Sequence, residues 1–273
     1  MITRTIPKSR EELPVIGLGT WQTFDVETER ERRPLAEVLD RFSAAGGRVI
    51  DSSPMYGRAE EAVGALREHV PQAFLATKVW TRGREHGIEQ MTRSMTLLRA
   101  DVIDLMQIHN LVDWRTHLAT LRQWKAEGRV RYLGITHYTT SAFRELESIV
   151  QAEEIDFVQL PLSVGVPDAE ERLLPLARDR GIAVLVNRPF EEGTALRDLR
   201  RRPLPDWARD YGAESWAELL LRWIVSHPAV TCVIPATRNP EHMRDNLRAG
   251  EGRILSMKER RELRARLQLE VDR

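Results

Sequence analysis

Four side chains in the first half of the chain, Asp51, Tyr56, Lys78 and His109, could together move a proton onto a carbonyl oxygen. A phenol has an ordinary pKa of about 10, which is too high to release its proton readily at neutral pH. A neighbouring ammonium lowers that pKa, and a carboxylate holds the ammonium in place. A nearby imidazole can donate a hydrogen bond to an oxygen that gains negative charge. This group, which we call the tetrad, therefore predicts a proton donor and an oxyanion stabiliser for carbonyl reduction or the reverse alcohol oxidation.

Each member of the tetrad has a simpler explanation when it is considered alone. An aspartate after a strand commonly caps a helix or turn, a loop tyrosine commonly packs, and a histidine can be hydrogen-bonded in a core. Lys78 is harder to explain in this way, because it lies in the apolar run AFLATKVW, where an unpaired lysine is costly to bury. Only four of the 41 basic residues are lysines. The order of the four residues, each at or just after an apolar run, indicates a catalytic group.

Eight short apolar runs are the elements that must position these side chains. Their nearly continuous apolar character is typical of strands buried on both faces, and amphipathic stretches follow most of them. The runs cover residues 15–20, 48–53, 73–79, 102–109, 130–137, 157–163, 182–187 and 231–237. Strands that alternate with helices at such regular spacing predict an α/β fold, the (β/α)8 or TIM barrel.

A doubly wound open sheet is the alternative arrangement. A dinucleotide-binding sheet of that kind carries G-x-G-x-x-G after its first strand. Here Gly17 and Gly19 are followed by Thr20, Trp21 and Gln22, so the third glycine is missing. The sequence therefore favours the barrel.

The length of the chain allows for a barrel with few additions. Its 273 residues are close to the roughly 250 of one barrel, and no linker divides them, so we expect a single domain over residues 1–273. Residues 1–14 are expected to form a β-hairpin that closes the bottom of the barrel. The segment 188–230 is too long for one helix. The amphipathic stretch 255–267 predicts an extra C-terminal helix.

Composition argues against several classes of partner. The 41 basic and 41 acidic residues cancel, so nothing in the charge points to nucleic acid or an anionic membrane. The chain has no apolar run of roughly 18 residues that could span a membrane, and its start does not resemble a signal peptide. The single Cys232 fits a reducing compartment. We expect a cytoplasmic protein, a monomer or small homo-oligomer, that binds a small molecule but no metal, nucleic acid or membrane.

The same strand ends predict a substrate pocket. Barrel enzymes build their active sites from the carboxyl ends of the strands and the loops that follow. Trp21, Met55, Trp80 and Asn110 stand at such positions beside the tetrad. Three of these side chains are large and apolar, so we expect them to line an apolar mouth above the tetrad.

The sequence resembles the aldo-keto reductase family over nearly its whole length, from Gly17 to Asn246. The most specific matches are Asp-Ser-Ser-Pro-Met-Tyr-Gly (51–57), LATKVW (75–80), MQIHN (106–110), LGITHY (133–138) and IPATRNPEHMRDNL (234–247). The resemblance implies a (β/α)8 barrel that binds NADPH in an extended form without a Rossmann domain, in agreement with the missing glycine. It also implies that Tyr56 is the general acid, that Asp51 and Lys78 tune it, and that His109 orients the carbonyl.

The resemblance also assigns a set of cofactor contacts. Gln159 matches the residue that hydrogen-bonds the nicotinamide carboxamide, and Thr136 and His137 stand where many members have serine and asparagine. Asn187 replaces an aromatic ring that commonly stacks on the nicotinamide. Arginines near the last strand suit the 2′-phosphate of NADP, which favours NADPH over NADH. The full set of predicted contacts is Thr20, Trp21, Thr136, His137, Gln159, Asn187, Thr237, Arg238, Arg244 and Asn246.

Several functions compete at this stage. The leading hypothesis is the NADPH-dependent reduction of a small aldehyde or ketone to an alcohol, or the reverse. The alternative on the same barrel is a catalytically weak NADP(H)-binding sensor or regulatory subunit, which Asn187 favours. A metal-dependent hydrolase would need several histidine and acidic ligands, whereas the first strand ends in Gly-Thr-Trp. A Schiff-base aldolase on Lys78 is disfavoured, because an adjacent carboxylate would keep that lysine protonated.

Overall fold

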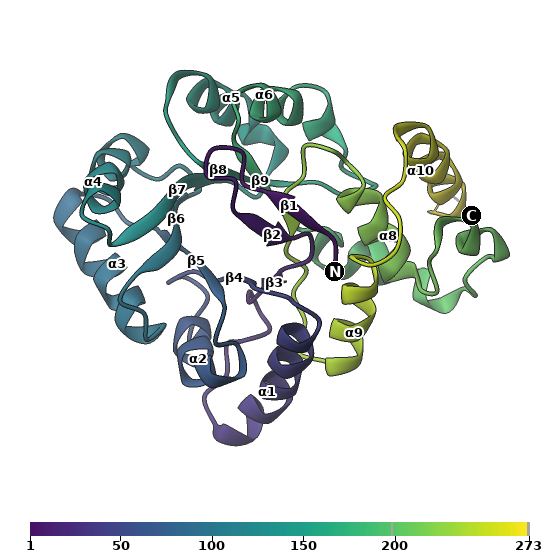
Figure 1. Cartoon of the computed structure of the whole chain (residues 1–273), viewed down its shortest axis with the longest axis horizontal. Helices are drawn as coiled ribbons and strands as arrows, with labels where there is room; N and C mark the ends of the chain where they lie inside the picture. The colour runs from purple at the N-terminus through teal and green to yellow at the C-terminus, as the bar shows by residue number, and fades with distance from the viewer. Residues whose placement is uncertain (198, 272–273) are drawn as a thin grey trace.

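Eight parallel strands form a barrel that is surrounded by helices (Figure 1). The computed structural model describes residues 1–197 and 199–271. Backbone hydrogen bonds from Gly17 to Val233 (2.8 Å) and from Gly19 to Pro235 (3.1 Å) join the first and last strands. The strands are β3 (Leu18–Gly19), β4 (Val49–Asp51), β5 (Phe74–Val79), β6 (Ile103–His109), β7 (Val130–Thr136), β8 (Phe157–Pro161), β9 (Ala183–Asn187) and β10 (Cys232–Val233). The eight predicted strands and the barrel fold are thus confirmed.

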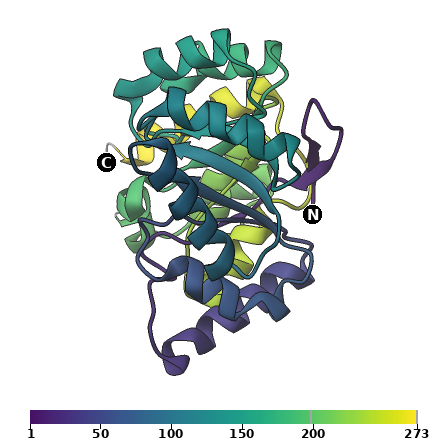
Figure 2. The same ribbon diagram turned by 90° about the vertical axis from the view of Figure 1, so that its left-hand side faces the viewer.

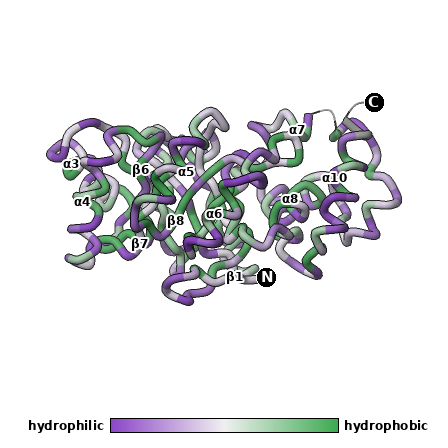
Figure 3. Tube along the Cα trace, turned by 90° about the horizontal axis from the view of Figure 1, so that it is seen from above, coloured by the Kyte–Doolittle hydropathy of each residue, from purple (hydrophilic) through white to green (hydrophobic). Residues whose placement is uncertain are grey.

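Helices form the outer layer between the strands. They are α1 (Glu29–Ala44), α2 (Ala59–Ala65), α3 (Arg84–Leu97), α4 (Trp114–Ala126), α5 (Phe143–Ala152), α6 (Leu173–Asp179), α7 (Thr194–Arg197), α8 (Trp216–Val225), α9 (Pro240–Arg248) and α10 (Met257–Val271). Helix α1 begins with a capping box, in which Thr28 and Glu31 satisfy each other's backbone N–H groups. Hydrophilic and hydrophobic residues alternate along the outer helices α3 and α4, as expected for helices that cover a core on one face (Figure 3). Within the described residues, no helix is long and apolar enough to cross a membrane.

The barrel interior is apolar at its lower end. Side chains of alternate strand residues fill it, because successive residues of a strand point to opposite faces. This inner cluster contains Val49, Phe74, Ala76, Leu105, Tyr132, Phe157, Ala183, Leu185, Cys232 and Ile234. The predicted N-terminal hairpin is confirmed: β1 (Thr3–Thr5) pairs antiparallel with β2 (Glu12–Pro14), and Ile6 and Leu13 join the inner cluster. The hairpin protrudes at one side of the molecule beside the N-terminus (Figure 2).

The remaining additions lie after β9. The long segment 188–230 holds short turns of helix as well as α7 and α8, as its length predicted; residue 198, inside it, lies outside the described residues. The predicted C-terminal helix is α10, which buries Leu263 and Leu267. The indole of Trp223 on α8 donates a hydrogen bond to the carbonyl of Arg260 on α10 (3.1 Å), which fixes the last helix on the outside of the barrel.

Candidate active site

The tetrad meets at the carboxyl ends of three neighbouring strands, β4, β5 and β6. Lys78 is completely buried, and its Nζ donates to Asp51 Oδ1 and to the carbonyl of Ser52, each at 2.6 Å. Burial alone would lower the pKa of Lys78, but the charges of Asp51 and Tyr56 raise it above its ordinary value. The buried pair therefore consists of a fixed ammonium and a carboxylate, the arrangement that the sequence predicted.

Tyr56 lies directly against this ion pair. Its ring centroid is 4.9 Å from Lys78 Nζ and 5.9 Å from the His109 ring, which it meets edge-on. Burial raises the pKa of Tyr56, while the Lys78 charge lowers it and the Asp51 charge raises it again. The lysine thus acts in the predicted direction, but burial outweighs it. The phenol consequently keeps its proton at neutral pH, as a general acid must.

The loop that carries Tyr56 is fixed by close backbone packing. Gly57 follows with a φ of +60°, and a Cβ at that position would lie 2.3 Å from Asp25 Oδ1. The same Asp25 oxygen accepts a hydrogen bond from the backbone N–H of Arg58 (2.9 Å). Only glycine fits this left-handed position without displacing the carboxylate, so Gly57 and Asp25 fix the path of the backbone directly after Tyr56.

His109 is held as a neutral ring. Its Nδ1 lies 3.0 Å from Ser53 Oγ, and burial together with the charges of Lys78 and His137 lowers its pKa to about 2. When Ser53 donates to Nδ1, the ring proton resides on Nε2. A neutral imidazole with an N–H can donate to a carbonyl oxygen without competing as an acid. The sequence reasoning did not predict Ser53 as a partner of His109, although it lies three positions before Tyr56 in the motif of residues 51–57.

Two buried amides complete the floor of the site. Asp51 Oδ2 accepts from Gln107 Nε2 and from Gln159 Nε2, each at 2.9 Å. Gln159 was predicted as a cofactor contact, whereas Gln107 was not predicted at all. The signal for Gln107 is its place two residues before His109 on the same strand, which puts both on the inner face of the barrel.

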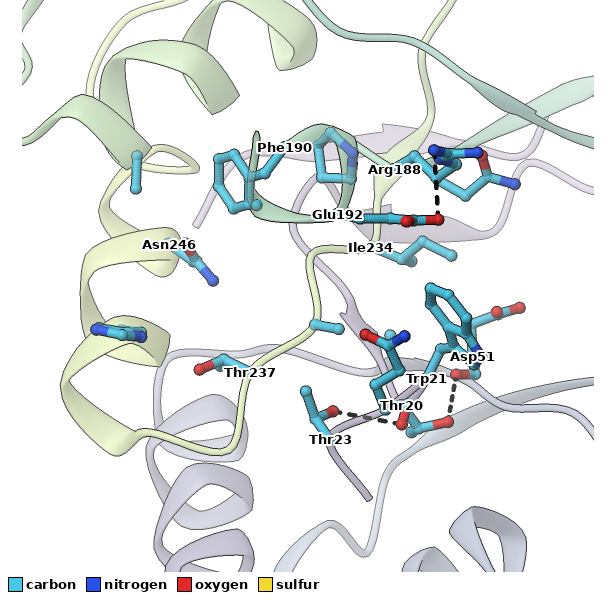
Figure 4. Close-up of a pocket in the computed structure, with 18 of the residues that line it drawn as sticks. Thr20, Trp21, Thr23, Asp51, Arg188, Phe190, Glu192, Ile234, Thr237 and Asn246 are labelled. Carbon is cyan, nitrogen blue, oxygen red and sulfur yellow. Dashed lines mark hydrogen bonds and ion pairs between the residues drawn. The ribbon is translucent and has the colours of Figure 1, made fainter. Parts of the chain in front are cut away.

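A cavity of about 980 Å³ opens above the tetrad and extends toward α9. Figure 4 shows Thr20, Trp21 and Asp51 at one end of it and Thr237 and Asn246 at the other, with Arg188, Phe190 and Glu192 between and above them. The predicted residues that line the cavity are Thr20, Trp21, Asp51, Met55, Tyr56, Trp80, His109, Asn110, Gln159, Asn187, Thr237 and Asn246. Lys78 lies behind Tyr56, where it can act on the phenol without entering the cavity.

The mouth of the cavity is open and apolar. Trp21, Met55, Trp80 and Tyr138 each keep 38 to 48% of their surface exposed there. The backbone of Trp80 is held by Gln90, whose Oε1 accepts from the Trp80 N–H (2.6 Å) and whose Nε2 donates to the Trp80 carbonyl (3.2 Å). An apolar rim above a few convergent polar groups, here Tyr56 and His109, is typical of a small-molecule site.

The end of the cavity around Gln159 fits a carboxamide. Asn187 Nδ2 donates to Gln159 Oε1 (3.2 Å), and Thr136 Oγ1 donates to the same oxygen (3.1 Å). The buried Asn187 Oδ1 has no hydrogen-bond partner among the described residues. A buried acceptor of this kind is costly unless a ligand satisfies it, and the amide of a nicotinamide has the required donor. Thr136 and His137 are not part of the lining formed by the described residues, so their direct contact stays a prediction.

The far end of the cavity differs in detail from the prediction. Arg244 pairs with Glu241 (2.8 Å) on the exposed face of α9, and neither it nor the exposed Arg238 lines the cavity in the described part of the chain. His242 and Asp245 line it together with the predicted Asn246. These three share one face of α9, because residues three and four positions apart are neighbours on a helix. If the sequence analysis had assigned this face of α9 to the cavity, it would have predicted His242 and Asp245 as lining residues.

The loop after β9 contributes further residues to the cavity, of which the sequence reasoning missed Phe190 and Glu192. Arg188 and Glu192 form an ion pair of 3.3 Å, and both line the cavity together with Phe190. Both charged residues have a positive φ, as does Glu191 between them. The carboxylate of Glu191 accepts a hydrogen bond from Ser163 Oγ (2.6 Å), which ties the loop to the end of β8. Among the described residues, no group of three histidine, cysteine, aspartate or glutamate side chains is placed to hold a metal ion.

Comparison with known proteins agrees with this arrangement. The family model of the aldo/keto reductases matches residues 15–266. A methylglyoxal reductase of Escherichia coli is 27% identical over 246 residues, which cover 86% of this chain and 84% of the relative. An NADH-specific methylglyoxal reductase of the same organism is 25% identical over 296 residues, and the alignment covers 86% of this chain and 89% of the relative.

Solved structures show the same fold. An aldo-keto reductase from Klebsiella pneumoniae in complex with NADPH superimposes with a TM-score of 0.81 at 24% identity, covering 98% of this chain and 96% of that one. A second structure from Klebsiella pneumoniae, in complex with NADP and acetate, has a TM-score of 0.79 at 23% identity, covering 96% and 94%. With the family model matched over most of its length and the tetrad assembled at the floor of the cavity, this chain belongs to the aldo/keto reductase family.

Proposed function

We propose that this protein reduces small aldehydes or ketones to alcohols with a reduced nicotinamide as hydride source and Tyr56 as general acid. The observation that carries the proposal is the buried Lys78–Asp51 pair directly behind a phenol at the floor of a large cavity. Burying two charges costs free energy, and apolar side chains would stabilise the core at least as well, so stability does not explain the pair. The effect of the pair on Tyr56 gives it a chemical role.

The proton steps follow from the positions of these side chains. A carbonyl oxygen beside Tyr56 and His109 would accept a hydrogen bond from each, which polarises the carbonyl. The hydride for the carbonyl carbon would come from a reduced nicotinamide held in the cavity. Tyr56 gives its proton to the oxygen, and the resulting phenolate is stabilised by the Lys78 ammonium, which Asp51 holds in place. A proton from solvent then restores the phenol.

We propose small, reactive carbonyl compounds as the substrates. Three relatives bear the name methylglyoxal reductase, which makes methylglyoxal the natural first substrate to test. The apolar side chains of Trp21 and Trp80 also favour aldehydes with a methyl or aromatic substituent.

For the cofactor we propose NADPH in preference to NADH. Related structures from Klebsiella pneumoniae hold NADP or NADPH, and Arg238, although it does not line the cavity in the described part of the chain, follows directly on Thr237, which lines the far end. A guanidinium there would pair with a 2′-phosphate. One relative is named as NADH-specific, so the preference needs its own measurement. In a titration of bound cofactor by fluorescence quenching, Arg238→Ala should weaken binding of NADP+ but leave binding of NAD+ nearly unchanged.

A substrate screen with both reduced nicotinamides tests the function itself. The loss of NADPH or NADH absorbance would be followed with methylglyoxal, other short aldehydes, aromatic aldehydes and ketones. Turnover of at least one aldehyde supports the reductase. Tight cofactor binding without turnover of any carbonyl would instead favour the sensor on the same barrel.

A further inference from the structure

We propose that Gln107 is a positioning residue that holds the catalytic carboxylate Asp51 and the cofactor contact Gln159 in one hydrogen-bonded network. Through this network, a single buried amide would set both the acidity of Tyr56 and the orientation of the group offered to the nicotinamide. The inference rests on the proposed function, and its test includes measurements that need no turnover.

The contacts of Gln107 define the network. Its Nε2 donates to Asp51 Oδ2 (2.9 Å), and its Oε1 accepts from Gln159 Nε2 (3.1 Å). The Gln159 Nε2 group donates in addition to the same Asp51 oxygen (2.9 Å). Gln107 is completely buried, and Asp51 and Gln159 are each only 2% exposed. Both polar ends of the Gln107 amide are therefore satisfied within the site and away from water.

The chemistry of the acceptor fixes the direction of both amides. An ionised carboxylate can only accept hydrogen bonds, so both glutamines must turn their N–H groups toward Asp51. The Oε1 atom of Gln159 then faces the other way, where it accepts from Thr136 and Asn187. Asn187 carries the buried Oδ1 atom that lacks a partner within the described part of the chain. The hydrogen bonds thus run without interruption from the ion pair to the part of the cavity that fits a carboxamide.

The sheet register explains why Gln107 can make these contacts. Gln107 on β6 is the direct neighbour of Lys78 on β5. The inner-face residues of β6 are Leu105, Gln107 and His109. Leu105 belongs to the apolar inner cluster, His109 belongs to the tetrad, and Gln107 lies between them. Gln107 occupies the boundary level, where its amide meets the carboxylate of Asp51 and the amide of Gln159.

Removal of the amide should change both properties that it connects. Without the Gln107 N–H dipole, the Asp51 charge is less compensated, and that charge raises the pKa of Tyr56. In Gln107→Met the ultraviolet titration midpoint of Tyr56 should therefore rise by roughly half a pH unit. Gln159 also loses one of the two acceptors that orient it, so cofactor dissociation constants should rise about three- to tenfold, the equivalent of one hydrogen bond.

The experiment compares full-length wild type, Gln107→Met and Gln107→Glu. The tyrosinate absorbance of each is measured as the difference from the same protein carrying Tyr56→Phe, which isolates Tyr56. Gln107→Glu places a second carboxyl beside Asp51 and should raise the midpoint further than the methionine does. Thr120→Val is the control and should leave midpoint and binding unchanged, because it removes a buried hydroxyl that donates to the carbonyl of Thr116 on the same helix, α4.

Each outcome decides for or against Gln107. A raised Tyr56 midpoint together with weaker binding of NADP+ supports the network. A folded variant, with wild-type circular dichroism, whose midpoint and cofactor affinity both equal those of wild type overturns it, even if its melting temperature has fallen. If Gln107→Met does not fold, Gln107→Glu, which keeps the length of the side chain, is judged on cofactor affinity alone, because its added carboxyl raises the Tyr56 midpoint through its own charge. Absence of turnover in wild type would contradict the proposed function but not these two measurements.

Discussion

Lys78 Nζ and Asp51 Oδ1 lie 2.6 Å apart inside the barrel, where the lysine is completely buried and the aspartate nearly so. Taking two charges out of water costs several kcal/mol for each ion, and good geometry with further hydrogen bonds only balances that cost. The pair is therefore explained by what it does to Tyr56 rather than by stability. The predictions below follow from this relationship and from the cavity above it.

The first prediction concerns the identity of the cation. Lys78→Arg should lower kcat by roughly 10²-fold or more, because a planar guanidinium cannot take the place of a compact ammonium between Asp51, the Ser52 carbonyl and Tyr56. Lys125→Arg is the matched control. Lys125 pairs with Asp156 (2.5 Å) but is 40% exposed, so an arginine can make the same pair. Equal activity of Lys78→Arg and Lys125→Arg would contradict the proposed role of the Lys78 ammonium.

The second prediction concerns stability. Asp51→Asn leaves Lys78 buried without its carboxylate, which should lower the free energy of unfolding by about 3–5 kcal/mol. Glu241→Gln removes two surface ion pairs, to Arg41 and Arg244, and should cost less than about 1 kcal/mol. Denaturant titrations of both variants measure the difference. A loss in Asp51→Asn no greater than that in Glu241→Gln would show that the pair carries no buried charge.

The third prediction concerns pH. The pKa of His109 is about 2 in the folded protein, whereas an ordinary imidazole titrates near 6.5. Between these values the unfolded chain binds a proton that the folded protein does not, so this contribution to stability is complete above about pH 6.5 and declines as the pH falls. His109→Gln should thus lose less stability than wild type between about pH 7 and 4.5. Parallel melting curves for wild type and His109→Gln across this range would contradict the assignment.

The fourth prediction concerns the loop over the cavity. Arg188 is paired with Glu192 (3.3 Å), and a diphosphate in the cavity would compete with that carboxylate for the guanidinium. Glu192→Gln should therefore strengthen cofactor binding by about threefold, and Arg188→Gln should weaken it by a similar factor. Both changes should shrink at high salt. Weaker binding in Glu192→Gln, measured by fluorescence titration, would mean that the carboxylate orders the loop instead.

The sequence predicts the barrel and the tetrad because both follow from the positions of the apolar runs along the chain. Strands buried on both faces appear as continuous apolar runs, and the carboxyl ends of neighbouring parallel strands must meet at one end of the barrel. Asp51, Lys78 and His109 stand at such ends, and Tyr56 follows in the first loop. The positions of these four residues relative to the predicted strand ends were therefore enough to predict that they lie together.

The missed residues depend on information that a linear pattern does not carry. Gln107 needs the inner face of β6 to be known, and His242 needs the inward face of α9. The net shift of the Tyr56 pKa needs the depth of burial, which decides whether desolvation or the Lys78 charge prevails. Arg238 and Arg244 were chosen as cations near the last strand, yet α9 turns Arg244 toward Glu241 and away from the cavity.

The central claim is that Tyr56 donates the proton that completes carbonyl reduction. The most direct test is kcat for methylglyoxal reduction by wild type and by Tyr56→Phe, with cofactor binding measured in both to show that the site is intact. We expect the phenylalanine variant to bind cofactor as wild type does and to lose roughly 10²- to 10⁴-fold in kcat, the usual contribution of a general acid. Equal turnover in the two proteins would contradict the account.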